Sequence, residues 1–183
     1  MIKKTLNQNA KYAQEFMKTI ETDFIFSDKP INRFKVNLAE NKNTSINKNK
    51  LLNDLKTKIN SIENCNLKNN SKNLVLGEGN INADVMLIGE TPGEIEDETG
   101  LCFQGEVGNL LNKMLLAINI KRENIYTTYS INFRPPEDRK PTGQEIKRYA
   151  IFLKEHIAII DPKILILMGS TAMEAITGLS KIS

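Results

Sequence analysis

The sequence predicts an α/β fold of three layers, α/β/α, with a mostly parallel central sheet. Short apolar runs at residues 83–88, 124–131 and 163–168 are typical of strands, and we expect the first and last to be buried. Helical patterns lie between them, at residues 106–119 and 143–160. Strands that alternate with helices in this way indicate a sheet covered by helices.

The helices of this region have recognisable patterns. Thr142 precedes the second helix and Glu145 follows three residues later, as in a capping box. Gly169-Ser170-Thr171 opens a last helix, which should end near Gly178. The helix at 106–119 carries a broad apolar face, formed by Val107, Leu110, Leu111, Met114, Leu115 and Ile118.

Two segments of different composition precede the α/β domain, which we assign to residues 74–183. Residues 1–36 carry a helical pattern and are expected to form an N-terminal helical extension. Residues 37–73 are rich in Asn and Lys and are expected to be a linker, mobile from Asn37 to Asn49, with a short helix near residues 51–62.

Composition excludes several classes of protein. The 183 residues carry a net charge of only +3, so no global basic field indicates nucleic acid. The two cysteines, Cys65 and Cys102, are far apart and lack a CxxC partner, which argues against a disulfide scaffold and a complete zinc site. Neither a signal peptide nor an apolar run of about 20 residues is present, so we expect a cytoplasmic protein without a membrane anchor.

The loop from Gly89 to Asp97 is the first candidate site. Glu90 follows a buried apolar run directly, and Pro92-Gly93 then turns the chain. Open α/β sheets place ligands at the carboxyl ends of their strands. Glu90 is therefore positioned to orient a water molecule or stabilise a developing cation. The other acids could form a metal site or a solvated acidic loop; they are Glu94, Glu96, Asp97 and Glu98.

Other side chains have both a structural and a functional interpretation. Phe103 can pack in the core or stack on a planar ligand. Cys102 has no histidine near it in sequence and is interpreted as packing, as is His156 in the middle of a helix. A proline-stiffened loop carries three cations that are either ordinary surface charges or phosphate contacts, namely Arg134, Arg139 and Lys140.

The start of the last helix offers a further anion site. Free amides at Gly169 and Ser170 would suit a phosphate, although the same residues can be a plain helix cap.

These motifs, in this order, resemble the family 4 uracil-DNA glycosylases and close bacterial relatives in the uracil-DNA glycosylase superfamily. The resemblance covers about residues 74–178. The matching stretches are Gly77-Glu78-Gly79-Asn80, Gly89 to Asp97, Gly100 to Gly105, Arg134-Pro135-Pro136 with Arg139, Pro141-Thr142, and Pro162-Lys163 leading into Gly169.

The resemblance implies a hydrolase that flips uracil out of DNA and cleaves its N-glycosidic bond through an oxocarbenium-like sugar. Glu90 would then orient the water or stabilise the sugar, and Phe103 would stack on uracil. Backbone amides of the Glu90 to Gly93 turn would contact the base. The substrate-binding residues implied are Gly89, Thr91, Pro92, Gly93, Phe103 and Tyr129. Arg134 and the Gly169-Ser170 helix start would lie near phosphates. We expect a monomer whose partner is DNA containing uracil, in base excision repair.

The resemblance also implies a [4Fe–4S] cluster on four cysteines, from which this chain departs. Cys65 matches the second ligand position, whereas Ile62, Phe133 and Tyr149 stand at the other three. One thiolate cannot hold a cluster that takes four. We therefore expect no cofactor and no metal.

The base-reading positions depart as well. Tyr129 stands where the family has an asparagine that reads the uracil edge, and Asn132 lies on the opposite strand face. Thr91 replaces a smaller residue in the turn. The family's His-Pro-Ser loop and last strand would follow Ser183, so we expect an incomplete domain. The function predicted is a weakened or inactive uracil-DNA glycosylase-like hydrolase; the alternatives are a non-catalytic DNA-binding protein and a decayed remnant.

Overall fold

The computed structural model describes residues 38–179 of the chain, and the side chains of residues 47–179. The helical extension predicted for residues 1–36 lies outside the described residues.

The described chain begins with helix α2, Leu38–Asn60, and a short α3, Asn66–Asn70. The linker predicted from Asn37 to Asn49 is therefore wrong, because α2 includes all but its first residue. The Nζ of Lys48 donates a hydrogen bond to the carbonyl of Ile160 at 2.7 Å. Such tertiary contacts can stabilise a helix whose composition favours disorder, and composition cannot reveal them.

The sheet formed by the described residues has four strands in the order β1-β3-β2-β4. They are β1 (Gly77–Gly79), β2 (Val85–Gly89), β3 (Tyr126–Tyr129) and β4 (Ile164–Leu167). β2 pairs in parallel with β3 and with β4, whereas β1 runs antiparallel to β3. The prediction of a mostly parallel sheet is confirmed.

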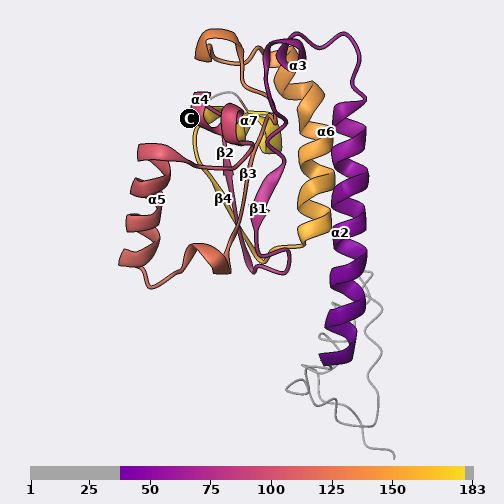
Figure 1. The fold of residues 1–183 in the computed structure, drawn as a ribbon, viewed down its shortest axis with the longest axis vertical. Helices are drawn as coiled ribbons and strands as arrows, with labels where there is room; N and C mark the ends of the chain where they lie inside the picture. Colours follow the sequence, from indigo (N-terminus) through magenta and orange to yellow (C-terminus); the bar gives the residue numbers. More distant parts are fainter. Residues whose placement is uncertain (1–37, 180–183) are drawn as a thin grey trace, which may run out of the picture. The chain divides into compact units, whose positions relative to one another are not determined.

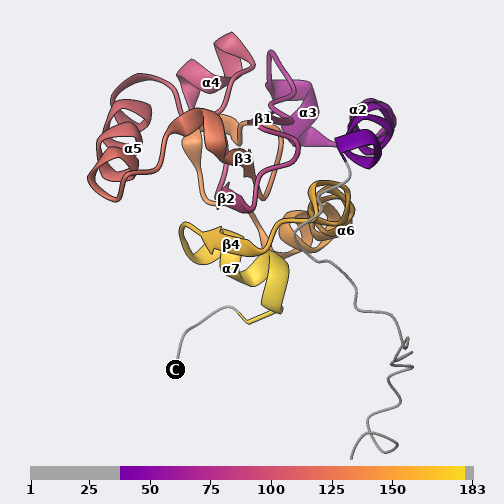
Figure 2. The ribbon, with the colours of Figure 1, turned by 90° about the horizontal axis from the view of Figure 1, so that it is seen from below.

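Helices cover both faces of this sheet (Figures 1 and 2). On one side α6 packs against α2 and α7, and α5 lies on the other side. Shorter helices lie in the connections between strands. The bounds are α4 (Glu94–Thr99), α5 (Gly105–Ala117), η1 (Arg122–Asn124), η2 (Pro136–Asp138), α6 (Gly143–Ile160) and α7 (Ser170–Thr177).

Strand alternation divides the core into two clusters. Met86 and Ile88 of β2 join the cluster on the α6 side, together with Tyr126 of β3. Leu87 and Tyr129 join the cluster on the α5 side. Because side chains alternate along a strand, the two faces carry separate cores, and the predicted three layers follow.

The apolar face of α5 is only partly used. Leu111 and Leu115 are buried, but Val107, Leu110 and Met114 are each more than half exposed. Periodicity predicted the helix correctly and its burial only in part. A broad apolar face shows which residues can be buried, whereas the neighbouring layer decides how many are.

The strand predicted at residues 163–168 exists as β4, but its predicted burial is wrong. Ile164, Leu165 and Ile166 are 55%, 38% and 38% exposed. β4 stands at the edge of the described sheet with β2 as its neighbour. An apolar run does not distinguish an edge strand from a central one.

Among residues 38–179, no helix combines the length and the apolar character that crossing a membrane requires. Cys65 and Cys102 are both buried free thiols. The cytoplasmic location stays a prediction.

The capping box predicted for α6 is confirmed. The Oγ1 of Thr142 accepts a hydrogen bond from the N–H of Glu145 at 3.3 Å, and Oε2 of Glu145 accepts one from the N–H of Thr142 at 2.7 Å. Arg139 also donates to the Glu145 carboxylate at 2.7 Å. The hydrogen bond from Arg139 is the main cause that lowers the pKa of Glu145 to about 2.

We expect Glu145→Gln to lower the free energy of unfolding at neutral pH. The variant's free energy of unfolding should also fall less than that of wild type as the pH is lowered. A carboxylate with a lowered pKa stabilises the fold fully above its ordinary value of 4.5, and this contribution is lost as the pH falls toward 2. Urea unfolding between pH 7 and pH 2 measures it. The difference between wild type and variant should shrink as pH falls, whereas the exposed control Glu137→Gln should show little difference. A constant difference for Glu145→Gln would contradict this assignment.

Candidate functional site

The candidate site lies where β2 and β3 end side by side. Gly89, the last residue of β2, pairs with Tyr129, the last residue of β3. Beyond them the N–H of Ser130 donates to the carbonyl of Gly89 at 2.8 Å, and its hydroxyl donates to the carbonyl of Glu90 at 2.5 Å. The loops that leave the two strands are therefore joined at their bases.

The carboxylate of Glu90 lies against the first turn of α7. Its Oε1 accepts the N–H of Thr171 at 2.8 Å and the hydroxyl of Ser170 at 3.3 Å. Within the described residues, Oε2 receives no hydrogen bond from the protein. One oxygen thus fixes the side chain, and the other is left for water or a ligand.

The charge of Glu90 is stabilised by this environment. Partial burial raises the pKa of Glu90, but hydrogen bonds from Thr171 and Ser170 and the charge of Lys140 outweigh burial, so the net pKa lies below its ordinary value. Lys140 reaches the same place, since its Nζ donates to the Ser170 hydroxyl at 3.0 Å. An ionised carboxylate at a helix N-terminus is the arrangement that the helix dipole favours.

Gly169 permits the close approach of Glu90 to α7. Its φ is +100°, and a Cβ built on it would lie 2.3 Å from Cδ of Glu90. The space that a side chain would take is filled by the carboxylate. The helix start at Gly169 and Ser170, predicted as an anion site for phosphate, therefore lies against a carboxylate of the same chain, which the Ser170 hydroxyl and the Thr171 N–H hold.

The Phe103 ring stacks on Tyr129. The ring centroids are 4.8 Å apart with an interplanar angle of 26°, and the N–H of Phe103 donates to the Tyr129 hydroxyl at 3.0 Å. A Cβ on Gly89 would lie 2.8 Å from both rings. The structure thus brings together three residues that were predicted to contact the base, and they contact one another.

The turn after Glu90 is partly engaged in folding. Thr91 is half-buried and Pro92 is buried. The N–H of Gly93, predicted to contact the base, donates to Oε2 of Glu96 at 3.1 Å, and Oε1 of Glu96 accepts the N–H of Gln104 at 2.9 Å. Glu96 therefore ties this turn to the loop that carries Phe103.

The acidic cluster is not a solvated loop throughout. Glu96 and Asp97 are 7% and 3% exposed, within the short helix α4. Asp97 accepts the N–H groups of Lys72 and Asn73 at 2.9 and 3.1 Å. The described residues contain no group of three or more side chains that could hold a metal ion. Backbone N–H groups account for both buried acids, those of Gly93 and Gln104 for Glu96 and those of Lys72 and Asn73 for Asp97.

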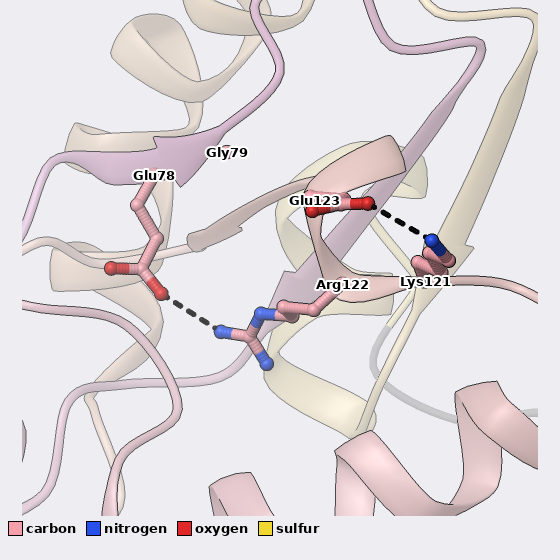
Figure 3. Close-up of a pocket in the computed structure, with 5 residues that line it drawn as sticks. All are labelled: Glu78, Gly79, Lys121, Arg122 and Glu123. Atoms are coloured by element: carbon pink, nitrogen blue, oxygen red, sulfur yellow. Dashed lines mark hydrogen bonds and ion pairs between the residues drawn. The ribbon is translucent and has the colours of Figure 1, made fainter.

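Sequence analysis did not identify Arg122, which supports Phe103. Its guanidinium donates to the carboxylate of Glu78 at 3.0 Å and to the carbonyl of Cys102 at 2.9 Å. It also lies 5.5 Å from the centroid of the Phe103 ring. Figure 3 shows Arg122 and Glu78 pointing toward one another beside a pocket of about 550 Å³. No local sequence pattern marks this pair, because the ion pair joins β1 to η1.

The cations of the proline-rich loop are paired with carboxylates. Arg134 donates from two nitrogens to Asp138, both at 2.7 Å, and Arg139 donates to Glu145. Asp138 is exposed, so its pair with Arg134 contributes little to stability, whereas Glu145 is only 20% exposed and also caps α6. Phosphate could replace Asp138 as the partner of Arg134 at small cost. Of the three predicted cations, Lys140 is linked to Glu90 through the hydroxyl of Ser170.

Three other side chains have structural roles. Asn132 lies beyond the end of β3 and donates to the carbonyl of Val75 at 3.0 Å. His156 is buried and lies 2.9 Å from the Tyr126 hydroxyl, and burial lowers its pKa to about 4. Cys102 is fully buried, and burial raises the pKa of its thiol far above its ordinary value. The interpretation of His156 and Cys102 as packing residues is confirmed.

The four positions that the resemblance assigns to cluster ligands meet in the core on the α6 side. Cys65 Sγ lies 3.3 Å from the Tyr149 hydroxyl, and the Tyr149 ring meets Phe133 edge to face with centroids 6.4 Å apart. Ile62 packs against the same cluster. A single thiol among apolar and aromatic side chains does not fit a cluster that needs four thiolates.

We expect Gly169→Ala to displace Glu90 from α7. The added Cβ would overlap the carboxylate, so the pKa of Glu90 should rise as its hydrogen bonds lengthen, and the protein should lose about 1–3 kcal/mol of stability. Carbon-13 NMR titration and urea unfolding measure these effects. Gly178→Ala is the matched control, since Gly178 also has positive φ but no atom within 4 Å of the added Cβ. A pKa change of equal size in both variants would show that contact with Glu90 is not the cause.

Comparison with known proteins assigns the chain to a family. A family model described as "Uracil DNA glycosylase superfamily" matches residues 76–182. The type-4 uracil-DNA glycosylase of Thermotoga maritima is 39% identical over 119 residues, which is 65% of this chain and 62% of the relative. The enzyme of the same name from Archaeoglobus fulgidus is 35% identical over 128 residues, or 70% and 64%.

The type-4 protein of Pyrobaculum aerophilum is 34% identical over 118 residues, which is 64% of this chain and 60% of the relative. The chain therefore spans less than two thirds of the length of these relatives. The family model covers more than half of the chain, including both strand ends and the start of α7. This chain belongs to the uracil-DNA glycosylase superfamily.

Proposed function

We propose that this chain is a uracil-DNA glycosylase-type hydrolase that acts on uracil flipped out of DNA. The main support for this proposal is the carboxylate of Glu90. It lies ionised at the end of β2, and its Oε1 is fixed by Thr171 and Ser170. Relatives named type-4 uracil-DNA glycosylase support the choice of substrate.

In the proposed reaction, water replaces the base on the sugar carbon, and the bond between that carbon and the base nitrogen breaks. The sugar becomes cationic as the base departs with the bonding electrons. A fixed carboxylate stabilises that cation and accepts a hydrogen bond from the attacking water. Oε2 of Glu90 is the oxygen we assign to this task, because Oε1 is held by α7.

DNA would approach over the loop that contains η2 and over the start of α7. Lys140 and Ser170 lie next to Glu90, and we propose that they contact a phosphate near the flipped nucleotide. Arg134 would exchange its exposed partner Asp138 for a further phosphate, and Arg139, whose side chain is 40% exposed, would contact another. In this proposal the chain acts as a monomer in base excision repair.

We further propose that the chain holds no iron–sulfur cluster. Its support is the packing of Cys65 against Tyr149, with Phe133 and Ile62 at the remaining positions. No step of the proposed reaction requires the cluster.

Anaerobic reconstitution with iron and sulfide tests this proposal. We expect wild type to retain no more iron or acid-labile sulfide than Cys65→Ser, because one buried thiol cannot anchor a cluster. Iron and sulfide retained by wild type and lost in Cys65→Ser would contradict it.

We expect Glu90→Gln to lower the rate of uracil excision by about 10²–10⁴, the usual contribution of a positioned general base. The assay measures cleavage of single- and double-stranded DNA that contains uracil. Glu98→Gln is the matched control, since Glu98 is an exposed acid of the same segment that pairs with Lys72. Excision that survives Glu90→Gln unchanged would exclude the assigned role.

A second candidate function is DNA binding without excision. The stacking of Tyr129 on Phe103 favours it, because both rings were expected to face the base and face each other instead. Binding of uracil-containing DNA with no cleavage by wild type would support this candidate over the hydrolase.

A further inference from the structure

We propose that the ring of Tyr129 takes the place of the flipped base on Phe103, and that a pyrimidine can enter only when this ring leaves. Tyr129 is thereby the residue that decides access to the base slot. The inference rests on the proposed role of Phe103 as the ring on which uracil stacks.

The geometry of the two rings supports this assignment. Their separation of 4.8 Å and angle of 26° are those of a stacked aromatic pair. A pyrimidine stacked on the same face of Phe103 would need the volume that the Tyr129 ring fills. Phe103 and Tyr129 are 6% and 5% exposed, so both rings are enclosed.

The surroundings leave little room beside the stack. A single added carbon on Gly89 would lie 2.8 Å from Cζ of Phe103 and from two carbons of the Tyr129 ring. Gly89 and Tyr129 are paired across β2 and β3, so their separation is fixed by the sheet. A whole base therefore cannot join the two rings in this conformation.

Of the two groups next to Phe103, Tyr129 is the one that carries no ion pair. Arg122 also lies near this ring, but Glu78 and the carbonyl of Cys102 both hold its guanidinium. The Tyr129 side chain packs in the core cluster of the α5 side, and its hydroxyl accepts the N–H of Phe103 and lies near the Glu96 carboxylate. It also stands at the end of β3, directly before Ser130, which contacts Glu90.

Replacing this ring by a small side chain should create a base slot next to Glu90. We expect full-length Tyr129→Val to bind free uracil at least about tenfold more tightly than wild type, because stacking on Phe103 then becomes available to the base. Valine suits a strand and leaves the ring volume empty. Saturation-transfer NMR and calorimetry with free uracil measure the affinity, and excision assays give KM and kcat separately.

Two controls separate access from general loosening of the core. Tyr129→Phe keeps the ring and should bind uracil within about threefold of wild type. Tyr126→Val removes an equally buried tyrosine of the same strand, on the face toward His156, and should bring no gain. Circular dichroism and thermal unfolding check that each variant is folded, and Tyr129→Asn replaces Tyr129→Val if the latter does not fold.

The outcomes are distinct for the inference and for the proposed function. Uracil binding gained by Tyr129→Val but not by Tyr126→Val supports the inference, even if no variant excises uracil, and absent excision would then count only against the hydrolase. Equal uracil binding by wild type and Tyr129→Val, at any level including none, overturns the inference. A similar gain in Tyr126→Val overturns it too.

Discussion

The contact between the Glu90 carboxylate and the first turn of α7 is the constraint on which the site depends. It joins the end of β2 to the helix that follows β4, and it exists because Gly169 has no side chain. The amides at a helix start need acceptors, and here a carboxylate supplies one. Folding thus fixes the same charge that the proposed chemistry uses, and because Oε1 alone is engaged, structure and chemistry use different oxygens.

Two of the acids that follow Glu90 also accept hydrogen bonds that fix neighbouring loops. Glu96 joins the turn at Gly93 to the Phe103 loop, and Asp97 fixes the chain at Lys72. These carboxylates accept hydrogen bonds from backbone N–H groups of the loops that they join. A segment that looks uniformly acidic in sequence therefore contains one acid that is open to ligands and two that hold its loops in place.

Local sequence patterns predicted the strands and helices that form this site, but not the contacts between them. A strand end marked Glu90, and a glycine before a helix marked Gly169, yet no pattern showed that the two touch. Arg122 escaped detection because its partners lie 44 and 20 residues away. The exposure of β4 was missed for the same reason, since burial depends on neighbouring layers and not on the strand itself. Fold class, helix caps and packing residues depend on nearby sequence, and these were predictable.

Three of the departures from the family, at two ligand positions and the base-reading position, share one physical character. Tyr129, Phe133 and Tyr149 all place aromatic rings in buried clusters. Each buried tyrosine hydroxyl has a partner, the N–H of Phe103 for Tyr129 and the thiol of Cys65 for Tyr149. A ring fills volume, and its satisfied hydroxyl avoids the penalty of an unpaired polar group. The positions that the resemblance assigns to a cluster and to a base are thus occupied by well-packed core, which is compatible with the family's fold.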